Sequence, residues 1–262
     1  MKTEDIRSIG RRVYERVKAS GVKGQSPLER GAGGDRTFPV DRLSEEIILE
    51  GLRGLGQRFH IVSEEAGILE MEGAGGLLYA VIDPVDGSKN AVTGIPVFGA
   101  SIAVCRGGEL GSADMGYVIN LVTGDEFWAQ KGQGAFQNGQ RIYCQQGAEL
   151  KLALFEARTP SVHLRRILPL LEGANRTRCL GSIALDLALL ASGAASLLVS
   201  PGASRSFDYA AGYLLVKEAG GVFTDMEGKD IDGQKLGMQT GASLLASANP
   251  EIHRAALKAL GL

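Results

Sequence analysis

The sequence predicts an α+β protein with two differently built halves, residues 1–147 and 148–262. The first half opens with two segments of helical periodicity and continues as a series of strand-like segments. In the second half strands and helices alternate, and the change of pattern near residues 146–151 marks the predicted boundary. A length of 262 residues allows one large domain or two fused halves of this kind.

The first half begins with two predicted amphipathic helices. Apolar residues recur every three or four positions over 3–20 and 39–55, and Pro39 suits a first helical turn. The polar, glycine-rich segment 21–35 between them predicts a mobile loop. Apolar runs then predict strands over 58–63, 77–82, 97–105, 113–119 and 126–129. Asn138-Gly139 predicts a two-residue hairpin turn.

The second half has the alternation that favours an α/β layer. Its predicted strands cover 152–158, 176–180, 195–200, 222–225 and 243–247. Its predicted helices cover 161–171, 182–192 and 206–219, with a last helix that begins at Asn249-Pro250.

Composition excludes several classes of protein. With 28 basic and 30 acidic residues the formal net charge is -2, which argues against a strongly basic nucleic-acid binder and against a disordered acidic chain. No apolar run reaches the roughly 18 residues of a membrane helix. The first ten residues lack the apolar core of a signal peptide, so we expect a cytoplasmic protein. The three cysteines lie far apart, which disfavours a thiolate zinc site or a disulfide framework.

The most informative segment is Asp83-Pro84-Val85-Asp86-Gly87-Ser88, which follows a strongly apolar strand. Two carboxylates three residues apart at the end of a buried strand should converge on one side of a turn. At ~4 Å they would repel by ~4 kcal/mol at an effective dielectric of about 20. Protonation, a basic side chain or a cation must compensate, and Mg²⁺ prefers such oxygen ligands. The alternative is an acidic turn that only caps the next helix.

Three further features fit a phosphate and metal site. The amides of Gly87 and Ser88 would be free donors for a phosphate if a helix or turn begins there, and Lys89 could serve the same anion. Glu64-Glu65 ends a predicted strand, where side chains alternate, so only one of the two should join Asp83. Asp208 opens a predicted helix; its alternative role is to interact with the helix dipole.

Competing chemistries lack their motifs. The sequence contains no G-x-x-x-x-G-K-[ST], H-E-x-x-H, complete G-x-G-x-x-G or G-x-S-x-G pattern, and its three histidines are scattered. The D-x-x-D spacing also weakens an aspartyl-phosphate interpretation. Carboxylate-bound metal acting on phosphate remains, because a metal polarises phosphoryl oxygens and lowers the pKa of a bound water.

Taken together, these motifs resemble the inositol monophosphatase family, within the group that includes fructose-1,6-bisphosphatases. The family's D-P-[IV]-D-G-[TS] signature, followed by N and later P, is present at 83–88 with Asn90 and Pro96. Its second signature is similar to residues 207–212 and 218–221, and Ser63-Glu64-Glu65 resembles the upstream acidic motif. The resemblance spans about residues 30 to 250 and implies a layered αβαβα sandwich and a homodimer.

The resemblance also implies roles for single residues. The implied metal ligands are Glu64, Asp83, the Val85 carbonyl, Asp86 and Asp208, which would hold two or three Mg²⁺ ions or Mn²⁺ in their place. The implied catalytic residues are Asp41, Ser88, Glu64 and Asp83, with Asp41 orienting the Ser88 hydroxyl and the attacking water. The implied substrate contacts are Asp86, Gly87, Ser88, Gly181, Ser182, Ile183, Arg205 and Asp208. Glu65 is left outside the metal's ligands, and residues 31–35 resemble the family's mobile catalytic loop, which can help hold a further metal.

Two positions bear on the substrate. Pro201 stands where many inositol monophosphatases have Glu, and Arg205 lies close to Asp208, as in archaeal-type enzymes that also take fructose 1,6-bisphosphate. We therefore expect an Mg²⁺-dependent phosphatase of inositol 1-phosphate and/or fructose 1,6-bisphosphate. The alternatives are a nucleotide phosphatase, acting on 3′-phosphoadenosine 5′-phosphate or NADP, and a non-catalytic phosphate- or metal-binding regulatory partner.

Overall fold

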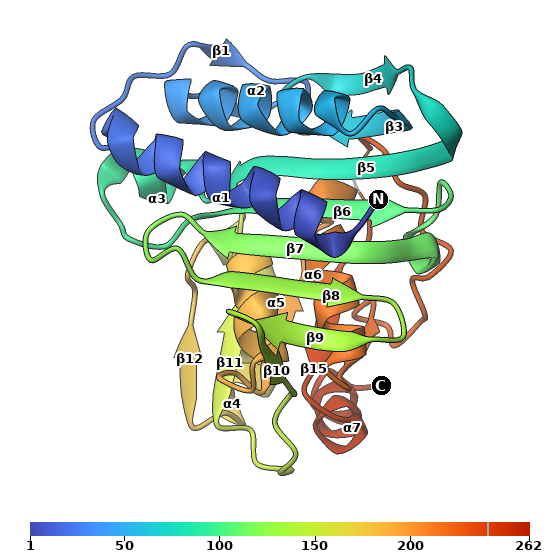
Figure 1. Cartoon of the computed structure of the whole chain (residues 1–262). Helices are drawn as coiled ribbons and strands as arrows, with labels where there is room; N and C mark the ends of the chain where they lie inside the picture. The colour runs from blue at the N-terminus through green and yellow to red at the C-terminus, as the bar shows by residue number, and fades with distance from the viewer. Residues whose placement is uncertain (240) are drawn as a thin grey trace.

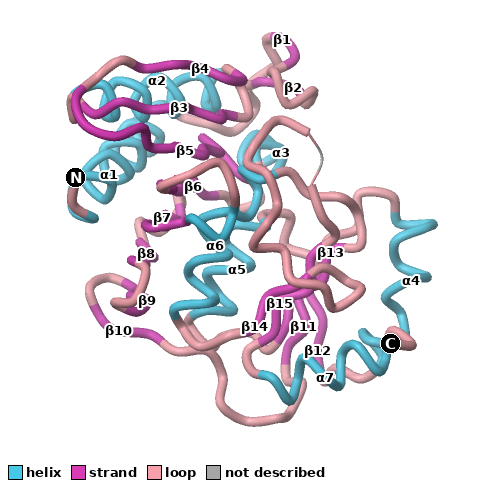
Figure 2. Tube along the Cα trace, turned by 90° about the vertical axis from the view of Figure 1, so that its right-hand side faces the viewer, coloured by secondary structure: helices cyan, strands magenta, loops and turns pink. Residues whose placement is uncertain are grey.

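A computed structural model describes residues 1–239 and 241–262 and arranges them in five layers, in the order αβαβα (Figure 1). Helices α1 (Thr3–Ser20) and α2 (Pro39–Gly54) cover the outer face of a large sheet. Helices α5 (Ile183–Ala191) and α6 (Ser206–Glu218) lie between this sheet and a smaller one (Figure 2). Helices α4 (Pro160–Glu172) and α7 (Pro250–Ala259) cover the far side. The expected α+β sandwich is confirmed.

The large sheet has eight strands in the order β10-β9-β8-β7-β6-β5-β3-β4, all antiparallel except for the β3–β5 pair. Its strands are β3 (Gln57–Ser63), β4 (Gly67–Met71), β5 (Ala74–Asp86), β6 (Gly99–Cys105), β7 (Ala113–Asn120), β8 (Glu126–Gln130), β9 (Gly134–Gln137) and β10 (Gln140–Ile142). The hairpin turn at Asn138-Gly139 is confirmed between β9 and β10. Two short helical segments, α3 (Ser88–Thr93) and the 3₁₀ turn Leu110–Ser112, connect strands of this sheet.

Strand β5 differs from its prediction in a way that shapes the site. It continues past Ile82 to Asp86, with Asp83 opposite Ser101 and Asp86 opposite Gly99, and its register shifts between the two acids. Pro84 lies within the shift, where the ladder hydrogen bond that proline cannot donate is not required. The two aspartates therefore lie on an irregular strand end and not in a turn that follows the strand.

Both faces of the large sheet are buried, which explains the continuous apolar run of β6. Ala100, Ile102 and Val104 belong to the core under α1 and α2, whereas Ala103 and Cys105 belong to the core on the other side. This alternation follows from the two-residue period of a strand.

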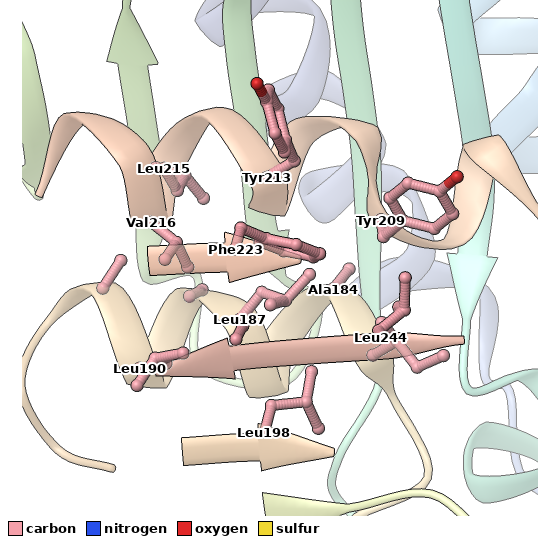
Figure 3. Packing of buried hydrophobic residues seen from close by; sticks show 14 of the residues in the cluster. Ala184, Leu187, Leu190, Leu198, Tyr209, Tyr213, Leu215, Val216, Phe223 and Leu244 are labelled. Atoms are coloured by element: carbon pink, nitrogen blue, oxygen red, sulfur yellow. The ribbon is translucent and has the colours of Figure 1, made fainter. Parts of the chain in front are cut away.

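The second core joins the two halves of the chain. Leu187 of α5, Tyr213 of α6 and Phe223 lie in it between the two sheets (Figure 3). Gly116 of β7 lets α6 approach closely, because a Cβ there would lie 2.6 Å from the Ala211 carbonyl oxygen. The halves that the sequence separates at residue 147 thus share a core.

The smaller sheet has the order β12-β11-β13-β15-β14. Its strands are β11 (Leu152–Phe155), β12 (Arg176–Arg178), β13 (Leu197–Ser200), β14 (Val222–Thr224) and β15 (Leu244–Ser247). Strand β11 ends three residues before its predicted end, although the Glu156 amide still donates to the Val199 carbonyl oxygen of β13 at 3.0 Å. At the end of the predicted mobile loop 21–35 the structure forms a small ribbon, in which β1 (Glu29–Arg30) pairs with β2 (Arg36–Thr37) just beyond the loop. Among the described residues no helix is both long and apolar enough to cross a membrane.

Candidate active site

One solvent-open pocket of about 390 Å³ gathers most of the residues singled out in the sequence. It lies where β3 and β5 end, beside the first turns of α3 and α6 and the loop 31–37. Its acidic lining comes from several segments: Asp35, Glu64, Glu65, Asp83, Asp86 and Asp208. Its basic lining is Arg36, Lys89, Arg158 and Arg205.

The two aspartates of β5 are held differently. Asp83 is 1% exposed, and its Oδ1 accepts a hydrogen bond from the Val85 amide at 3.1 Å. Asp86 Oδ2 accepts from the Ser182 hydroxyl at 2.8 Å and from the Ala184 amide at 2.6 Å. Asp86 is therefore tied to the start of α5, so the site spans both halves of the chain.

Glu64 lies against Asp83. Two carboxyl groups buried side by side need a shared proton or a cation between them. Burial raises the pKa of Glu64 to about 8, with Arg205 opposing the shift and Asp208 adding to it. Burial, followed by the charge of Glu64, raises the pKa of Asp83 well above its usual range. The pKa of Asp86 rises to about 7, mainly through burial.

Glu65 also lines the pocket, although strand alternation predicts that only one of the two glutamates would reach it. The reason is that β3 ends at Ser63, so both glutamates lie in the turn beyond it. Glu65 accepts a hydrogen bond from the Thr37 hydroxyl and so faces the 31–37 loop.

Asp208 occupies the first turn of α6. Its Oδ2 accepts from the Arg205 amide at 2.7 Å, the capping role expected for an acid there, and lies 3.3 Å from Arg158 Nη2. Its Oδ1 lies 3.4 Å from Arg205 Nη2. Asp208 therefore caps the start of α6 and also lines the pocket, where it is buried.

Ser88 connects the pocket to Asp41. The Ser88 hydroxyl lies 2.7 Å from Asp41 Oδ1 and 2.8 Å from the Val85 carbonyl oxygen, and its single proton serves one acceptor at a time. Asp41 is 1% exposed and not a surface residue of its helix. Its other oxygen accepts from the Phe38 amide at 2.6 Å.

The expected phosphate position is the start of α3. Gly87 has a φ of +95°, and a Cβ there would lie 3.0 Å from the Val97 carbonyl oxygen, so the turn favours glycine. The first amides of a helix have no acceptor within it, and Gly87, Ser88 and Lys89 all line the pocket.

The predicted substrate loop is only partly at the surface. Gly181 lines the pocket, and its amide donates to Glu156 Oε1 at 3.0 Å. The side chains of Ser182 and Ile183 are buried behind it. Arg158 and Phe38 line the pocket without having been singled out in the sequence. Arg158 is the last residue of a predicted strand, and a strand end is a common place for ligand contacts.

The donor set fits a hard divalent cation in its chemistry. The ligands that the resemblance implies are four carboxylates and one carbonyl, all oxygen donors. Burial, and then the charges of neighbouring acids, raises the pKa values of Glu64, Asp83 and Asp86, the expected cost of a site built around a positive charge. Among residues 1–239 and 241–262 no three acidic, histidine or cysteine side chains are grouped so that they could hold a metal ion without rearrangement.

Known proteins share both sequence and fold with this chain. The model of the inositol monophosphatase family matches residues 11–261. A fructose-1,6-bisphosphatase/inositol-1-monophosphatase of Methanothermobacter thermautotrophicus is 36% identical, covering 89% of this chain and 86% of its own. An inositol-1-monophosphatase of Mesorhizobium japonicum is 32% identical, and the match covers 87% of this chain and 83% of that protein. The structure of a Thermotoga maritima IMPase is 27% identical, with a TM-score of 0.80 over 97% and 94% of the two chains. The chain therefore belongs to the inositol monophosphatase family and is a phosphoric monoester hydrolase.

Proposed function

We propose that the protein is an Mg²⁺-dependent phosphatase that hydrolyses inositol 1-phosphate and fructose 1,6-bisphosphate by direct attack of water. The observation that carries this proposal is the single pocket that holds Glu64, Asp83, Asp86 and Asp208 beside Ser88. These acids come from three separate segments of the chain, the turn after β3, the end of β5 and the start of α6, and a cation explains their convergence.

The proposed cation ligands are Glu64, Asp83, the Val85 carbonyl, Asp86 and Asp208, for two or three Mg²⁺ ions or Mn²⁺ in their place. Bound there, the metal would neutralise the phosphoryl oxygens and lower the pKa of the attacking water. The implied third site would involve the 31–35 loop, where Asp35 lines the pocket.

The chain itself positions the reactants. The amides of Gly87 and Ser88 are placed to donate to a phosphate, and Lys89 adds a positive charge beside them. Ser88, oriented by Asp41, would hold the attacking water in line with the ester bond. Because Asp41 is buried, its carboxylate has little freedom to point elsewhere.

The sugar would extend toward Gly181, with Ser182 and Ile183 contributing backbone contacts and support. Arg205 is a proposed contact near the sugar, but its guanidinium is already bonded to Asp35, Glu64 and Asp208. Arg158 has a side chain 49% exposed and a single ion pair, with Asp208 at 3.3 Å. We therefore propose Arg158 as the main partner of a second phosphate.

Two further proposals follow the family: a homodimer and a cytoplasmic location. Light scattering on a sizing column tests the first, and a monomer at micromolar concentration would contradict it. Imaging of a tagged chain in its host cells tests the second, and signal outside the cytoplasm would contradict it.

The decisive experiment for function is side-by-side turnover with Mg²⁺ on inositol 1-phosphate, fructose 1,6-bisphosphate, 3′-phosphoadenosine 5′-phosphate and NADP. We expect kcat/KM for the first two to exceed the others by at least about tenfold. Preference for a nucleotide would move the assignment to a nucleotide phosphatase. No release of phosphate from any of them would favour a non-catalytic partner.

A further inference from the structure

Arg205 is a buried cation at the meeting point of the acidic side chains. It is 6% exposed, and its guanidinium lies 4.7 Å from the centre of the Phe207 ring. Its Nη2 lies 2.9 Å from Glu64 Oε1 and 3.4 Å from Asp208 Oδ1. Its Nη1 lies 2.9 Å from Asp35 Oδ2 and donates to the Gly33 carbonyl oxygen at 2.8 Å. One side chain thus contacts two proposed metal ligands and the 31–35 loop.

The loop rests on the same acidic turn independently of Arg205. The Ala32 amide donates to the Glu65 carbonyl oxygen at 3.0 Å, and the Gly33 amide donates to the Glu64 carbonyl oxygen at 2.7 Å. A Cβ on Gly33 would lie 3.1 Å from Arg205 Nη1, so the backbone and the guanidinium are in close contact. The position of the loop and the position of Glu64 are therefore mechanically linked.

Arg205 and a divalent cation have the same preferred partners. Glu64 and Asp208 direct oxygens toward the guanidinium, and in the described part of the chain no three acidic, histidine or cysteine side chains are grouped so that they could hold a metal ion as they stand. A cation that binds these carboxylates must share them with Arg205 and lie near its positive charge. The two charges repel, and burial weakens the screening between them.

We propose that Arg205 is a resident counter-cation that competes with the metal for Glu64 and Asp208 and, in the metal-free protein, keeps the 31–35 loop against the pocket. This inference rests on the proposed metal site. Arg205 acts here as a positioning residue: it lowers metal affinity below what the carboxylates alone would give and links loop position to metal binding.

The first test measures Mn²⁺ affinity from the free-ion signal in electron paramagnetic resonance. Arg205→Met removes the competing charge, and we expect its Mn²⁺ dissociation constant to fall at least tenfold below that of the parent protein. Arg205→Lys keeps the charge and should stay within about threefold. The matched control is Arg166→Met, which loses an ion pair with Glu227 away from the pocket and should bind like the parent.

The second test measures loop position by trypsin cleavage after Arg30 and Arg36, both exposed. In the absence of metal, Arg205→Met and Arg205→Lys should be cut there at least tenfold faster than the parent or Arg166→Met. The Arg205 guanidinium bonds Asp35 through Nη1 and Glu64 through Nη2, whereas the single ammonium group of a lysine cannot hold both in that geometry. Circular dichroism shows whether each variant folds, and Arg205→Lys carries the loop test if Arg205→Met does not fold.

The outcomes separate this inference from the proposed function. A purely structural Arg205 would leave Mn²⁺ affinity unchanged or weaken it on substitution, and either result would overturn the counter-cation role. Unchanged cleavage in both variants would overturn the link to the loop. If the parent binds no Mn²⁺, the proposed metal site fails, and this inference fails with it.

Discussion

The Ser88 hydroxyl lies 2.7 Å from Asp41 Oδ1, which joins the start of α3 to the first turn of α2. Burial raises the pKa of Asp41 to about 6, against the opposing hydrogen bonds from Phe38 and Ser88. Above that pH Asp41 is a carboxylate that accepts a hydrogen bond from the Ser88 hydroxyl and leaves the hydroxyl oxygen free to accept one from a water. The pair is therefore built to orient a nucleophile.

The Ser88 series tests this relationship. Ser88→Ala removes the hydroxyl and should lower kcat by roughly 10²-fold or more, the cost of a misplaced reactant. Ser88→Thr keeps the hydroxyl and fixes its rotamer, so it should stay within about tenfold of the parent. Steady-state kinetics at saturating Mg²⁺ measures both, and an Ala variant that turns over at the parent rate would contradict the role.

Asp83→Asn tests the acidic core. The substitution removes a charge that the metal would need, and a metal contributes several kcal/mol to stabilising phosphoryl transfer, so kcat should fall by about 10³-fold or more. The fold should persist, because neutralising one of two crowded buried carboxyl groups relieves repulsion. The metal-free melting temperature should therefore be equal to or above that of the parent. Phosphate release at the parent rate would show that the metal assignment is wrong.

Metal removal gives the third prediction. Excess EDTA should abolish phosphate release, and Mg²⁺ added above the chelator should restore it, because no other electrophile for the phosphoryl group is built into the proposed mechanism. Circular dichroism before and after chelation is the control for unfolding. Full activity in excess chelator would exclude the mechanism.

Arg158→Met addresses the substrate. If Arg158 binds a second phosphate, the variant should lose at least about tenfold more kcat/KM on fructose 1,6-bisphosphate than on inositol 1-phosphate, the 1.4 kcal/mol scale of one charge-assisted contact. Arg166→Met, outside the pocket, should not change the ratio. Equal losses on both substrates would place the role of Arg158 in supporting Asp208.

Much of the fold could be predicted because its elements have clear periodicity. The helix over 3–20 begins and ends as its apolar spacing predicts, and the strand predicted over 97–105 is present as Gly99–Cys105, buried on both faces. Strand β4 could not be predicted this way, since it is short, lies at the sheet edge and leaves Ile68 54% exposed. Its pairing with β3 comes from tertiary contacts that a local pattern does not contain.

The site residues, like the strands, could be predicted only where a local motif marks them. The motif around Asp83 and Asp86 identifies acids that do share a pocket with Asp208, and the Asp41–Ser88 pair is in contact as the resemblance implies. Glu65 reaches the pocket because β3 ends at Ser63, and Arg158 reaches it through its ion pair with Asp208, which lies 50 residues away in the sequence. The bonds of Arg205 to Glu64 and Asp35 join segments about 140 and 170 residues apart in sequence, a distance that no local pattern spans.

The central claim is that acids from distant segments bind divalent cations in one pocket. A crystal soaked in Mn²⁺ and measured at the manganese absorption edge tests it most directly. We predict anomalous density at the end of β5, within coordination distance of Asp83, Asp86 and the Val85 carbonyl oxygen, with Asp208 turned toward it. A saturated crystal with no such density, or with Asp208 directed away from the ion, would contradict the account.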